Sequence, residues 1–427
     1  MKTFYITLFS VFFAFVSFAQ KLGFTQLLDS GKNEYRRQFS EVKSDFSKCY
    51  TLFEQAVLLQ PNSAEARYWL GHAIDKINMA DGSTLNRSTK ELTVQASEQF
   101  ERVIKLEKKY KGEIFNLDPY SKLTAIWGSL ALAYLIKKEK DSALWAYAEG
   151  RRRGAFNDAI LEFNRQLLES CTPNAILLCQ GDNITLPIYY LQEVEDFRKD
   201  VSIVDVNLGS TNWYNDFIRR TATFKFTYED PELDSLGFRE WAPQEQIIIN
   251  ENNKQEFIKW TLKPTYYQNY VLKSDLVLLD IFKNNFFKRD FYYSGTNVDS
   301  SMGSLHLDAA NYITLNGVIC KVVRTPNVSD TAVLNIPPAL KKYNIDNVSQ
   351  ENINNSPDVL SLFNQMRYAY LVYVWSLLDK QKFKEAKELW SEMEQKFFLS
   401  KLPLVSELNE PYKKLRNATM ESKRLTN

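Results

Sequence analysis

Residues 179–208 read CQGDNITLPIYYLQEVEDFRKDVSIVDVNL, and the change of periodicity around this stretch decides the fold. NAILLCQ (174–180) is a continuous apolar run of strand length, and LPIYYLQEVEDFR (186–198) has helical spacing. A second apolar run, VSIVDVNL (201–208), completes a strand–helix–strand unit. Such a unit predicts two parallel strands joined by a right-handed crossover, and strands that are apolar on both faces predict helices on each side of the sheet.

The turns that follow these two strands carry the candidate binding residues. Ligands of open parallel sheets bind at the edge where the strands end, which is where residues 181–183 and 207–212 lie. The candidate ligand- or partner-binding residues are Asp182, Asn183, Thr185, Asn207, Asn212, Trp213 and Tyr214. The structural alternative is that Asp182, Asn183 or Thr185 only caps the helix, with Pro187 in its first turn. No catalytic residue is assigned, because no second acid, histidine or metal-binding set is evident nearby.

Residues 46–170 have the spacing of helical repeats. The clearest copy, WGSLALAYLIKKEKDSALWAYAEG (127–150), matches the tetratricopeptide pattern of large, small and aromatic residues on two paired helices. An upstream copy contains Leu70-Gly71 and is interrupted by an insertion around residues 78–92. The small residues of this pattern allow two helices to approach closely, so the sequence predicts a stack of helix pairs that bury their faces against one another.

Further elements follow the strand–helix–strand unit. QIIIN (246–250) reads as a strand, NKQEFIKWTLK (253–263) as a helix, and SDLVLLDIFKNNFF (274–287) as an amphipathic helix. KRDFYYSG (288–295) and GVICKVVRT (317–325) read as strands. The expected fold is therefore a mostly parallel sheet of four or five strands. Glycine-rich phosphate-binding signatures are absent, and no cofactor is expected.

The C-terminal part returns to helical spacing. YAYLVYVWSLLDKQKFKEAKELWSEM (368–393) repeats the earlier helix-pair pattern, and its aromatic residues are expected to pack in a core. The chain thus combines α/β and all-α parts. The expected divisions are a signal peptide (1–19), tetratricopeptide-like helices (20–170), an α/β domain (171–326), a linker (327–357) and a C-terminal helical repeat segment (358–427).

The N-terminus has the features of an export signal. Lys2 precedes an almost unbroken apolar run from Phe4 to Phe18, and small residues at 17 and 19 suit a signal peptidase. An uncleaved anchor is the alternative. No later segment approaches the run of about 18 apolar residues that a membrane span requires, so none is expected after cleavage. The expected location is the periplasm or the cell surface.

Composition excludes several classes of function. The formal net charge is +1, which argues against nucleic-acid binding. The 4 cysteines are too few for a disulfide scaffold, although a Cys171–Cys179 bridge remains an alternative to buried thiols. The 2 histidines, His72 and His306, are far apart and predict neither a zinc site nor a serine–histidine–aspartate triad.

The stretch GDNITLPIYYLQEVEDFRKDV (181–201), followed by NWY, resembles a bacterial family of multi-pass membrane proteins termed protein O-mannosyltransferase-like or of unknown function. The segment NNFFKRDFYYSG (284–295) resembles a later motif of that family. The resemblance covers roughly residues 170–415 and implies a shared extracytoplasmic fold. Two departures are that Ile184 replaces an acid of the motif and Asp290 replaces a proline. The membrane helices that carry the expected sugar transfer are missing, so the resemblance implies no transferase activity here.

Two functions are therefore expected as alternatives. The first is an exported, non-enzymatic binding or scaffold protein that uses its helical repeats to engage a protein partner of the cell envelope. The second is a glycan-handling protein, lectin-like or related to glycosyltransferases, that uses the strand-end edge near Asp182 and Trp213. Neither alternative involves a metal, nucleic acid or cofactor, and the oligomeric state is left open.

Overall fold

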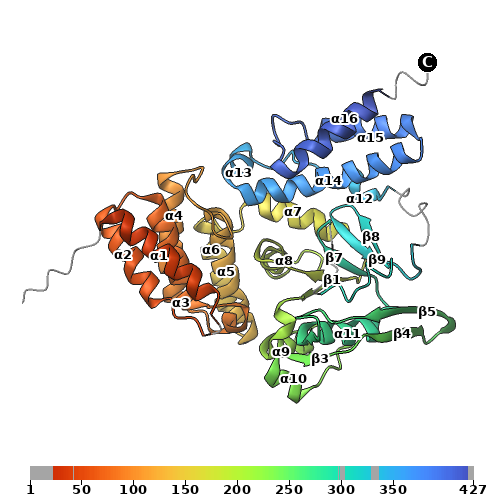
Figure 1. Cartoon of the computed structure of the whole chain (residues 1–427), viewed down its shortest axis with the longest axis horizontal. Helices are drawn as coiled ribbons and strands as arrows, with labels where there is room; N and C mark the ends of the chain where they lie inside the picture. Colours follow the sequence, from red (N-terminus) through yellow and green to blue (C-terminus); the bar gives the residue numbers. More distant parts are fainter. Residues whose placement is uncertain (1–22, 42, 297, 299–302, 328–335, 422–427) are drawn as a thin grey trace, which may run out of the picture.

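Figure 1 shows three groups of elements, with paired helices at one side, a sheet at the centre and a second group of helices beside the sheet. The computed structural model describes residues 23–41, 43–296, 298, 303–327 and 336–421. The signal peptide expected over residues 1–19 lies outside the described residues. Within them, no helix is both long and apolar enough to cross a membrane. The expected combination of N-terminal helices, a mostly parallel sheet and C-terminal helices is confirmed.

Consecutive helices of the first part pack in pairs, and each pair packs on the next. The pairs are α1 (Phe24–Phe39) with α2 (Ser47–Leu59), α3 (Ala64–Asn78) with α4 (Lys90–Leu106), and α5 (Pro119–Ile136) with α6 (Lys140–Arg152). Glycines allow the close approach that the repeat pattern predicts. A methyl group on Gly71 would lie 2.9 Å from the ring of Phe100, and one on Gly150 would lie 2.7 Å from Trp127. The expected insertion forms a short 3₁₀ helix, η1 (Gly82–Arg87).

The central sheet has five strands among the described residues, in the order β2–β1–β7–β9–β8. Their bounds are Ile176–Cys179 (β1), Ser202–Asp205 (β2), Phe291–Ser294 (β7), Ile313–Asn316 (β8) and Ile319–Val322 (β9). β1 is parallel to β2 on one side and to β7 on the other, whereas β9 is antiparallel to both β7 and β8. β9 alone of these five therefore runs against the others, and β2 is an edge strand.

From β1, the chain leads first to a strand on one side of β1 and later to a strand on its other side. The chain passes from β1 through α8 (Asp182–Val194) to its neighbour β2, and later through α11 (Lys273–Asn285) to β7 on the opposite side of β1. α8 packs against α7 (Asp158–Glu169), and Figure 1 shows α7 and α11 on opposite sides of the sheet. The carboxyl end of β1 is consequently a topological switch point, where open α/β sheets bind ligands. Gly181 and Asp182 occupy it.

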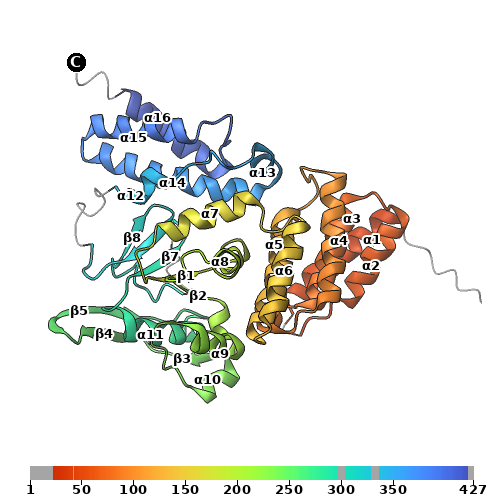
Figure 2. The same ribbon diagram turned by 180° about the vertical axis from the view of Figure 1, so that it is seen from behind.

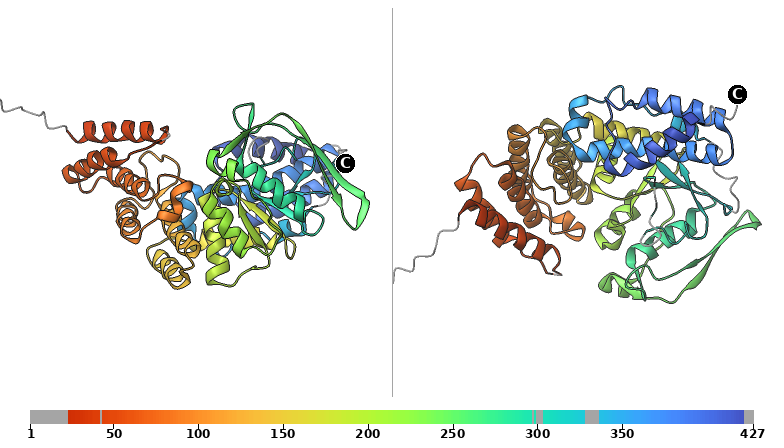
Figure 3. Two further views of the ribbon diagram at one scale, coloured as in Figure 1. Left: turned by 90° about the horizontal axis from the view of Figure 1, so that it is seen from below. Right: turned by 45° about the horizontal axis from the view of Figure 1, so that its top comes forward.

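The connection from β2 to α11 contains a strand where the sequence analysis expected a helix. After η2 (Leu208–Ser210), α9 (Asn212–Thr221) and α10 (Pro231–Leu236), β4 (Gln244–Asn250) and β5 (Asn253–Leu262) form a hairpin that projects in both views of Figure 3. The helical prediction for 253–263 is wrong because Ile258, Trp260 and Leu262 alternate with exposed residues. Their buried face packs on α11, with the Trp260 and Phe282 rings 5.7 Å apart. β3 (Phe238–Glu240) and β6 (Tyr270–Leu272) form a second small sheet.

The C-terminal helices pack along α7 and the β8–β9 end of the sheet, as Figure 2 shows from behind. They are α12 (Pro338–Lys342), α13 (Gln350–Asn355), α14 (Pro357–Asp379), α15 (Phe383–Lys396), η4 (Ser406–Leu408) and α16 (Asn409–Glu421). Two short helices, α12 and α13, lie within the stretch expected to be a linker, and they bury Leu340 and Ile353. The aromatic residues of α14 and α15 pack in the core as expected, since Tyr370 and Trp390 are fully buried.

A shared carboxylate joins the N-terminal and C-terminal helices. Asp118 precedes α5, and one of its oxygens accepts hydrogen bonds from the amides of Tyr120 and Ser121 at 2.8 and 3.1 Å. Its other oxygen accepts from the Ser356 hydroxyl and from the Asp358 amide at the start of α14. Asp358 reciprocates by accepting from the Asp118 amide at 2.8 Å. The N-termini of two helices that are distant in sequence therefore meet at one carboxylate pair.

Candidate functional site

The corner after β1 starts α8 without a side-chain cap. Gly181 has φ +91°, a left-handed conformation that favours glycine, and the helix begins immediately at Asp182. Neither Asp182, Asn183 nor Thr185 makes a capping hydrogen bond, so the capping prediction is wrong. The reason is that these three side chains already lie within the helix instead of before it. Pro187 accordingly lies inside α8, beyond its first turn.

Asn164 compensates for the proline inside α8. Pro187 has no N–H to donate, which leaves the carbonyl of Asn183, four residues earlier, without its helical partner. The Asn164 side-chain amide on α7 donates to that carbonyl at 2.9 Å and to the Ile160 carbonyl at 2.8 Å. The Asn183 side chain in turn donates to Ser121 Oγ on α5 at 3.0 Å. Asn183 therefore joins three helices, and we assign it a structural role.

Thr185 and Tyr214 are buried around Asp205, at the end of β2. The Thr185 hydroxyl donates to one Asp205 oxygen at 2.6 Å, and the other oxygen accepts the amides of Asn207 and Leu208, each at 2.9 Å. The Tyr214 hydroxyl accepts the Asp205 amide hydrogen at 2.7 Å. Burial raises the pKa of Asp205. These bonds fix the turn after β2, so the hydroxyl groups of Thr185 and Tyr214 hold the strand-end edge in place.

The Asp182 side chain is exposed to solvent at the switch point. Neighbouring protein groups nevertheless displace part of the water around its carboxyl group. Burial raises the pKa of its carboxyl group, and the nearby Lys122 opposes that rise. Lys122 on α5 is itself paired with Asp75 on α3 at 2.5 Å, and both side chains are almost completely buried. Lys76 also lies close enough to affect Asp182 electrostatically. Two cations, Lys76 and Lys122, and two carboxylates, Asp75 and Asp182, therefore lie near one another where α3 and α5 meet the start of α8.

The remaining predicted residues follow β2 and contact different neighbours. The Trp213 indole donates to the Ser83 carbonyl of η1 at 2.9 Å, so the insertion between α3 and α4 covers this part of the edge. Asn212 accepts a hydrogen bond from the buried Lys273, which also pairs with Asp234 at 2.6 Å. The Asn207 side chain is exposed. Among the predicted residues, Asp182, Asn207 and Asn212 are exposed, whereas Trp213 is half-buried.

The described residues contain no group of three histidine, cysteine, aspartate or glutamate side chains that could hold a metal ion. All four cysteines are buried free thiols, so the Cys171–Cys179 bridge is not formed. Burial raises the pKa of both thiols, which disfavours the reactive thiolate. His72 is also buried, and its pKa lies well below the ordinary value because of desolvation. Its Nδ1 lies 3.4 Å from the Tyr35 hydroxyl.

A groove of about 500 Å³ lies on the open side of β2, and no pattern in the sequence predicted it. The turn between α5 and α6, the end of α8, the edge strand and the end of α9 line this groove, which we call the β2 groove. Its cationic lining residues are Lys138, Lys140, Lys199 and Arg220, and its acidic one is Glu193. The lysine run at 137–140 was the available sequence signal, but it reads equally well as the polar end of a helix.

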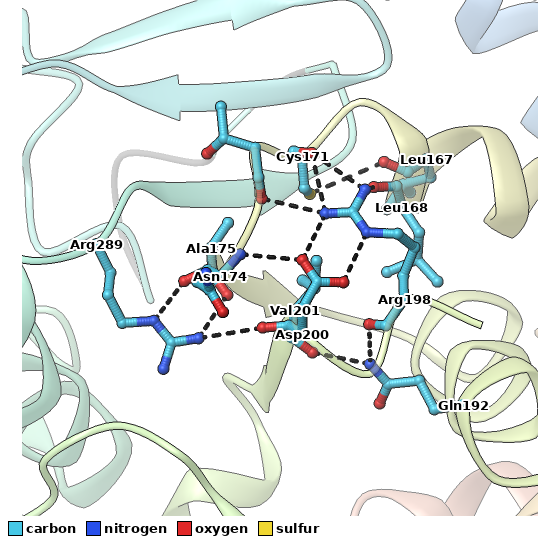
Figure 4. Close-up of polar contacts among 11 residues, drawn as sticks. Leu167, Leu168, Cys171, Asn174, Ala175, Gln192, Arg198, Asp200, Val201 and Arg289 are labelled. Carbon is cyan, nitrogen blue, oxygen red and sulfur yellow. Dashed lines mark hydrogen bonds and ion pairs between the residues drawn. The ribbon is translucent and has the colours of Figure 1, made fainter. Parts of the chain in front are cut away.

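A second feature that sequence reasoning missed is Arg198, shown in Figure 4. Its guanidinium pairs with both oxygens of Asp200, at 2.8 and 3.0 Å. It also donates to the carbonyls of Leu168, Cys171 and Thr172, at 2.7 to 3.2 Å. The hydrogen bonds from Arg198 lower the pKa of Asp200 to about 2. This cluster joins the end of α7 to the start of β2, at the opposite end of the strands from Asp182.

Arg289 completes the same region from the β7 side (Figure 4). It donates to the carbonyl of Asn174, to that of Ala175 at 3.1 Å and to Ser202 Oγ at 2.9 Å. It therefore ties the beginnings of β1 and β2 to the segment that precedes β7. The motif residues Arg198 and Asp200, together with Arg289, thus stabilise the fold of the sheet.

The fold and site define a protein in which helix pairs and a mostly parallel sheet meet around a partly accessible strand-end edge. Residues 160–227 match the family model described as TMEM260-associated domain 2. The matched segment begins in α7 and includes β1, α8, β2 and α9, so it contains the Arg198 cluster and the strand-end residues. No tetratricopeptide family model matches the chain. No curated protein matches it either.

Proposed function

We propose that this chain is an exported, non-enzymatic binding or scaffold protein whose helix pairs engage a protein partner of the cell envelope. The observation that carries the proposal is the β2 groove, in which the α5–α6 turn faces an edge strand across an open volume of about 500 Å³. A volume of this size is typical of binding sites. The groove lining that the structure describes contains neither histidine nor cysteine, the residue types that most often act as base or nucleophile.

We further propose that the helix pairs are of the tetratricopeptide type. The spacing of residues 127–150 and the close contacts of Gly71 and Gly150 with aromatic side chains support this assignment. Arrays of such pairs present extended surfaces that bind other proteins. The apolar N-terminal run supports export, because it has the length and flanking residues of a signal peptide.

In-cell photo-cross-linking tests the proposal. A photoreactive amino acid is placed at Lys138 beside the groove, at Lys105 on α4 or at Lys414 on α16, all of which are exposed. We expect one discrete envelope protein to be cross-linked from Lys138 or Lys105 and not from the control position Lys414. Cell fractionation should recover the tagged chain outside the cytoplasm. Absence of a specific adduct from both helix-pair positions, or equal adducts from Lys414, would contradict the proposal.

The second candidate is a glycan-handling protein, lectin-like or less directly a relative of glycosyltransferases. The observation that favours it is that Asp182, after β1, and Asn207, after β2, are both exposed at the carboxyl edge of the sheet, with Trp213 in the helix that follows β2. Exposed polar groups and an aromatic ring at one edge would suit the polar edges and apolar faces of sugars. The family resemblance of residues 181–201 supports the same candidate.

A glycan array separates the two candidates. The glycan-handling candidate predicts binding by the wild-type chain and loss of that binding with Asp182→Ala and with Trp213→Ala. Lys384→Gln on α15 serves as a surface control, because this exposed residue is remote from the sheet edge. If the wild type binds no glycan, or if Asp182→Ala and Trp213→Ala bind as the wild type does, this candidate fails.

A further inference from the structure

The open side of β2 presents one residue, Ile203, whose backbone N–H and C=O both lack a hydrogen-bond partner among the described residues. Ser202 and Val206 donate their amide hydrogens to β1, to the carbonyls of Ala175 and Cys179. Because peptide groups alternate in direction along a strand, those of Val201, Ile203 and Asp205 point away from β1. This side of the strand faces the β2 groove, which Val201, Ser202 and Ile203 line.

Side chains bond the two backbone groups that flank Ile203 on this side, the Val201 carbonyl and the Asp205 amide. The Val201 carbonyl accepts a hydrogen bond from the Gln192 side chain at 2.8 Å, and the Asp205 amide donates to the Tyr214 hydroxyl at 2.7 Å. Ile203 lies between these two residues, and its N–H and C=O have no hydrogen-bond partner among the described residues. An unpaired strand edge of this kind is a template for an added strand. Ile203 thus provides one donor and one acceptor at the base of the groove.

The wall opposite this strand is cationic. Lys138 has no ion pair among the described residues, and its backbone has φ +66°, which positions it in the tight turn before α6. Lys140 lies 3.9 Å from Glu193, a loose ion pair. Lys199 pairs with Asp196, and Arg220 donates to the carbonyls at the end of α5. Lys138 and Lys140 are therefore the charges that remain available to an incoming anionic group.

We propose that the β2 groove binds an extended acidic peptide segment, which pairs with Ile203 as an added strand and directs carboxylates towards Lys138 and Lys140. This inference deepens the proposed binding function and rests on it, since it names the chemistry of the partner segment. An extended polypeptide supplies both an acceptor and a donor to Ile203, whereas a simple anion supplies acceptors alone. Alternate side chains of an added strand point to the same face, so two acidic residues spaced by one can address the two lysines.

The test uses a fluorescein-labelled probe peptide, Val-Glu-Val-Glu-Val, with blocked ends, and fluorescence anisotropy. The uncharged peptide Val-Gln-Val-Gln-Val should bind the full-length mature chain about fivefold more weakly or worse, because two exposed ion pairs are lost. A probe with N-methylated backbone amides should bind at least as poorly, because it cannot pair as a strand. Hydrogen exchange of residues 201–206 should slow when the acidic probe is bound.

Matched variants locate the effect. Asn is chosen to replace Lys138 because asparagine tolerates the left-handed backbone conformation of this position. The double variant Lys138→Asn/Lys140→Gln should lose the preference for the acidic probe. The control Lys384→Gln combined with Lys414→Gln removes the same charge from exposed sites on α15 and α16 and should leave the preference unchanged. Circular dichroism confirms that both double variants are folded.

Four results would overturn the inference: no binding of the acidic probe at millimolar concentration, an N-methylated probe that binds as tightly, equal affinity for the simple anion citrate, or an unchanged preference in Lys138→Asn/Lys140→Gln. If the probe fails while Lys138 or Lys105 still cross-links to an envelope protein, the strand-pairing inference fails and the proposed function stands. If the probe binds as described but no cross-linked partner exists, the groove has the proposed chemistry and the envelope-scaffold proposal fails.

Discussion

Arg198 and Asp200 form a bidentate ion pair beside both the end of α7 and the start of β2. Nε and Nη2 of the arginine lie 2.8 and 3.0 Å from the two carboxylate oxygens. The same guanidinium donates to three backbone carbonyls of residues 168–172. A planar fork with five N–H donors is needed to make all of these bonds, and lysine cannot replace it. The pair therefore fixes the angle at which the helix leads into the sheet.

Arg198→Lys should lower the free energy of unfolding by about 2 kcal/mol, because several partly buried hydrogen bonds to a charged group are lost together. Urea denaturation at pH 7 measures this change. Arg152→Lys is the control, since Arg152 is exposed and pairs only with Glu149 among the described residues. It should cost less than about 0.5 kcal/mol. Equal costs for the two substitutions would show that the carbonyl contacts of Arg198 contribute nothing.

The hydrogen bond from Asn164 to the Asn183 carbonyl should depend on Pro187. Asn164→Ala in the wild-type background leaves that buried carbonyl without a donor and should cost about 1–3 kcal/mol. In Pro187→Ala the restored amide hydrogen can bond the same carbonyl, so Asn164→Ala should cost less there. A double-mutant cycle from urea denaturation measures the difference as an interaction energy. Strict additivity of the two substitutions would contradict the compensation by Asn164.

The Asp118–Asp358 pair should make stability decrease as pH rises. Burial, and then the charge of Asp358, raises the pKa of Asp118 from its ordinary value of 3.8 to about 7. The folded state therefore binds this proton more tightly than the unfolded state, so the contribution of Asp118 to stability falls between about pH 4 and pH 7. Asp358→Asn removes the repulsion and should reduce the loss of stability between pH 5.5 and pH 8.

Urea denaturation of the wild type and Asp358→Asn at both pH values checks this prediction. Asp346→Asn, at an exposed position in the same C-terminal part, is the control for the loss of one charge and should keep the wild-type pH dependence. A pH dependence in Asp358→Asn as steep as that of the wild type would mean that the charge of Asp358 does not contribute to the raised pKa of Asp118.

Lys122→Met should be strongly destabilising, by about 3 kcal/mol, because it leaves the buried Asp75 without its cation. The double variant Lys122→Met/Asp75→Leu should recover much of that loss, since no unpaired charge remains buried. Asp182→Asn should change stability by less than about 0.5 kcal/mol, because the side chain is solvent accessible and makes no hydrogen bond among the described residues. Thermal and urea unfolding would contradict this order if Lys122→Met and Asp182→Asn proved equivalent.

Local periodicity was sufficient to predict the strand–helix–strand unit and the paired helices. β1 is apolar throughout and the segment around β2 is mostly apolar, and the glycines at 71 and 150 lie where close helix contacts require them. The helical prediction for residues 253–263 is wrong because the spacing of their apolar residues fits both the period of a helix and that of a strand. Only the packing of Ile258, Trp260 and Leu262 on α11 selects the strand. This is a tertiary preference that a single segment does not encode.

The location of the candidate residues in the fold could be predicted from the sequence, but their contacts could not. Asp182 lies at the switch point, as the order of strand and turn indicated, yet Asn183, Thr185 and Tyr214 serve the fold. Their roles depend on Ser121 and Asp205, which come from other elements of the chain. The β2 groove could not be predicted, because the lysines at 138 and 140 meet Ile203 only through packing of the last helix pair against the sheet domain.

The contact between α5 and α8 fixes the direction in which the helical array can lengthen. A methyl group on Gly128 of α5 would lie 2.7 Å from Leu186 of α8, so the crossover helix of the sheet also seals the last helix pair. Repeat arrays need such a sealing element at each end. An extra helix pair inserted after α6 would separate Gly128 from Leu186 and expose both surfaces, whereas one inserted before α1 would leave this junction intact. The junction between α5 and α8 is therefore the point at which the helical array ends against the sheet domain.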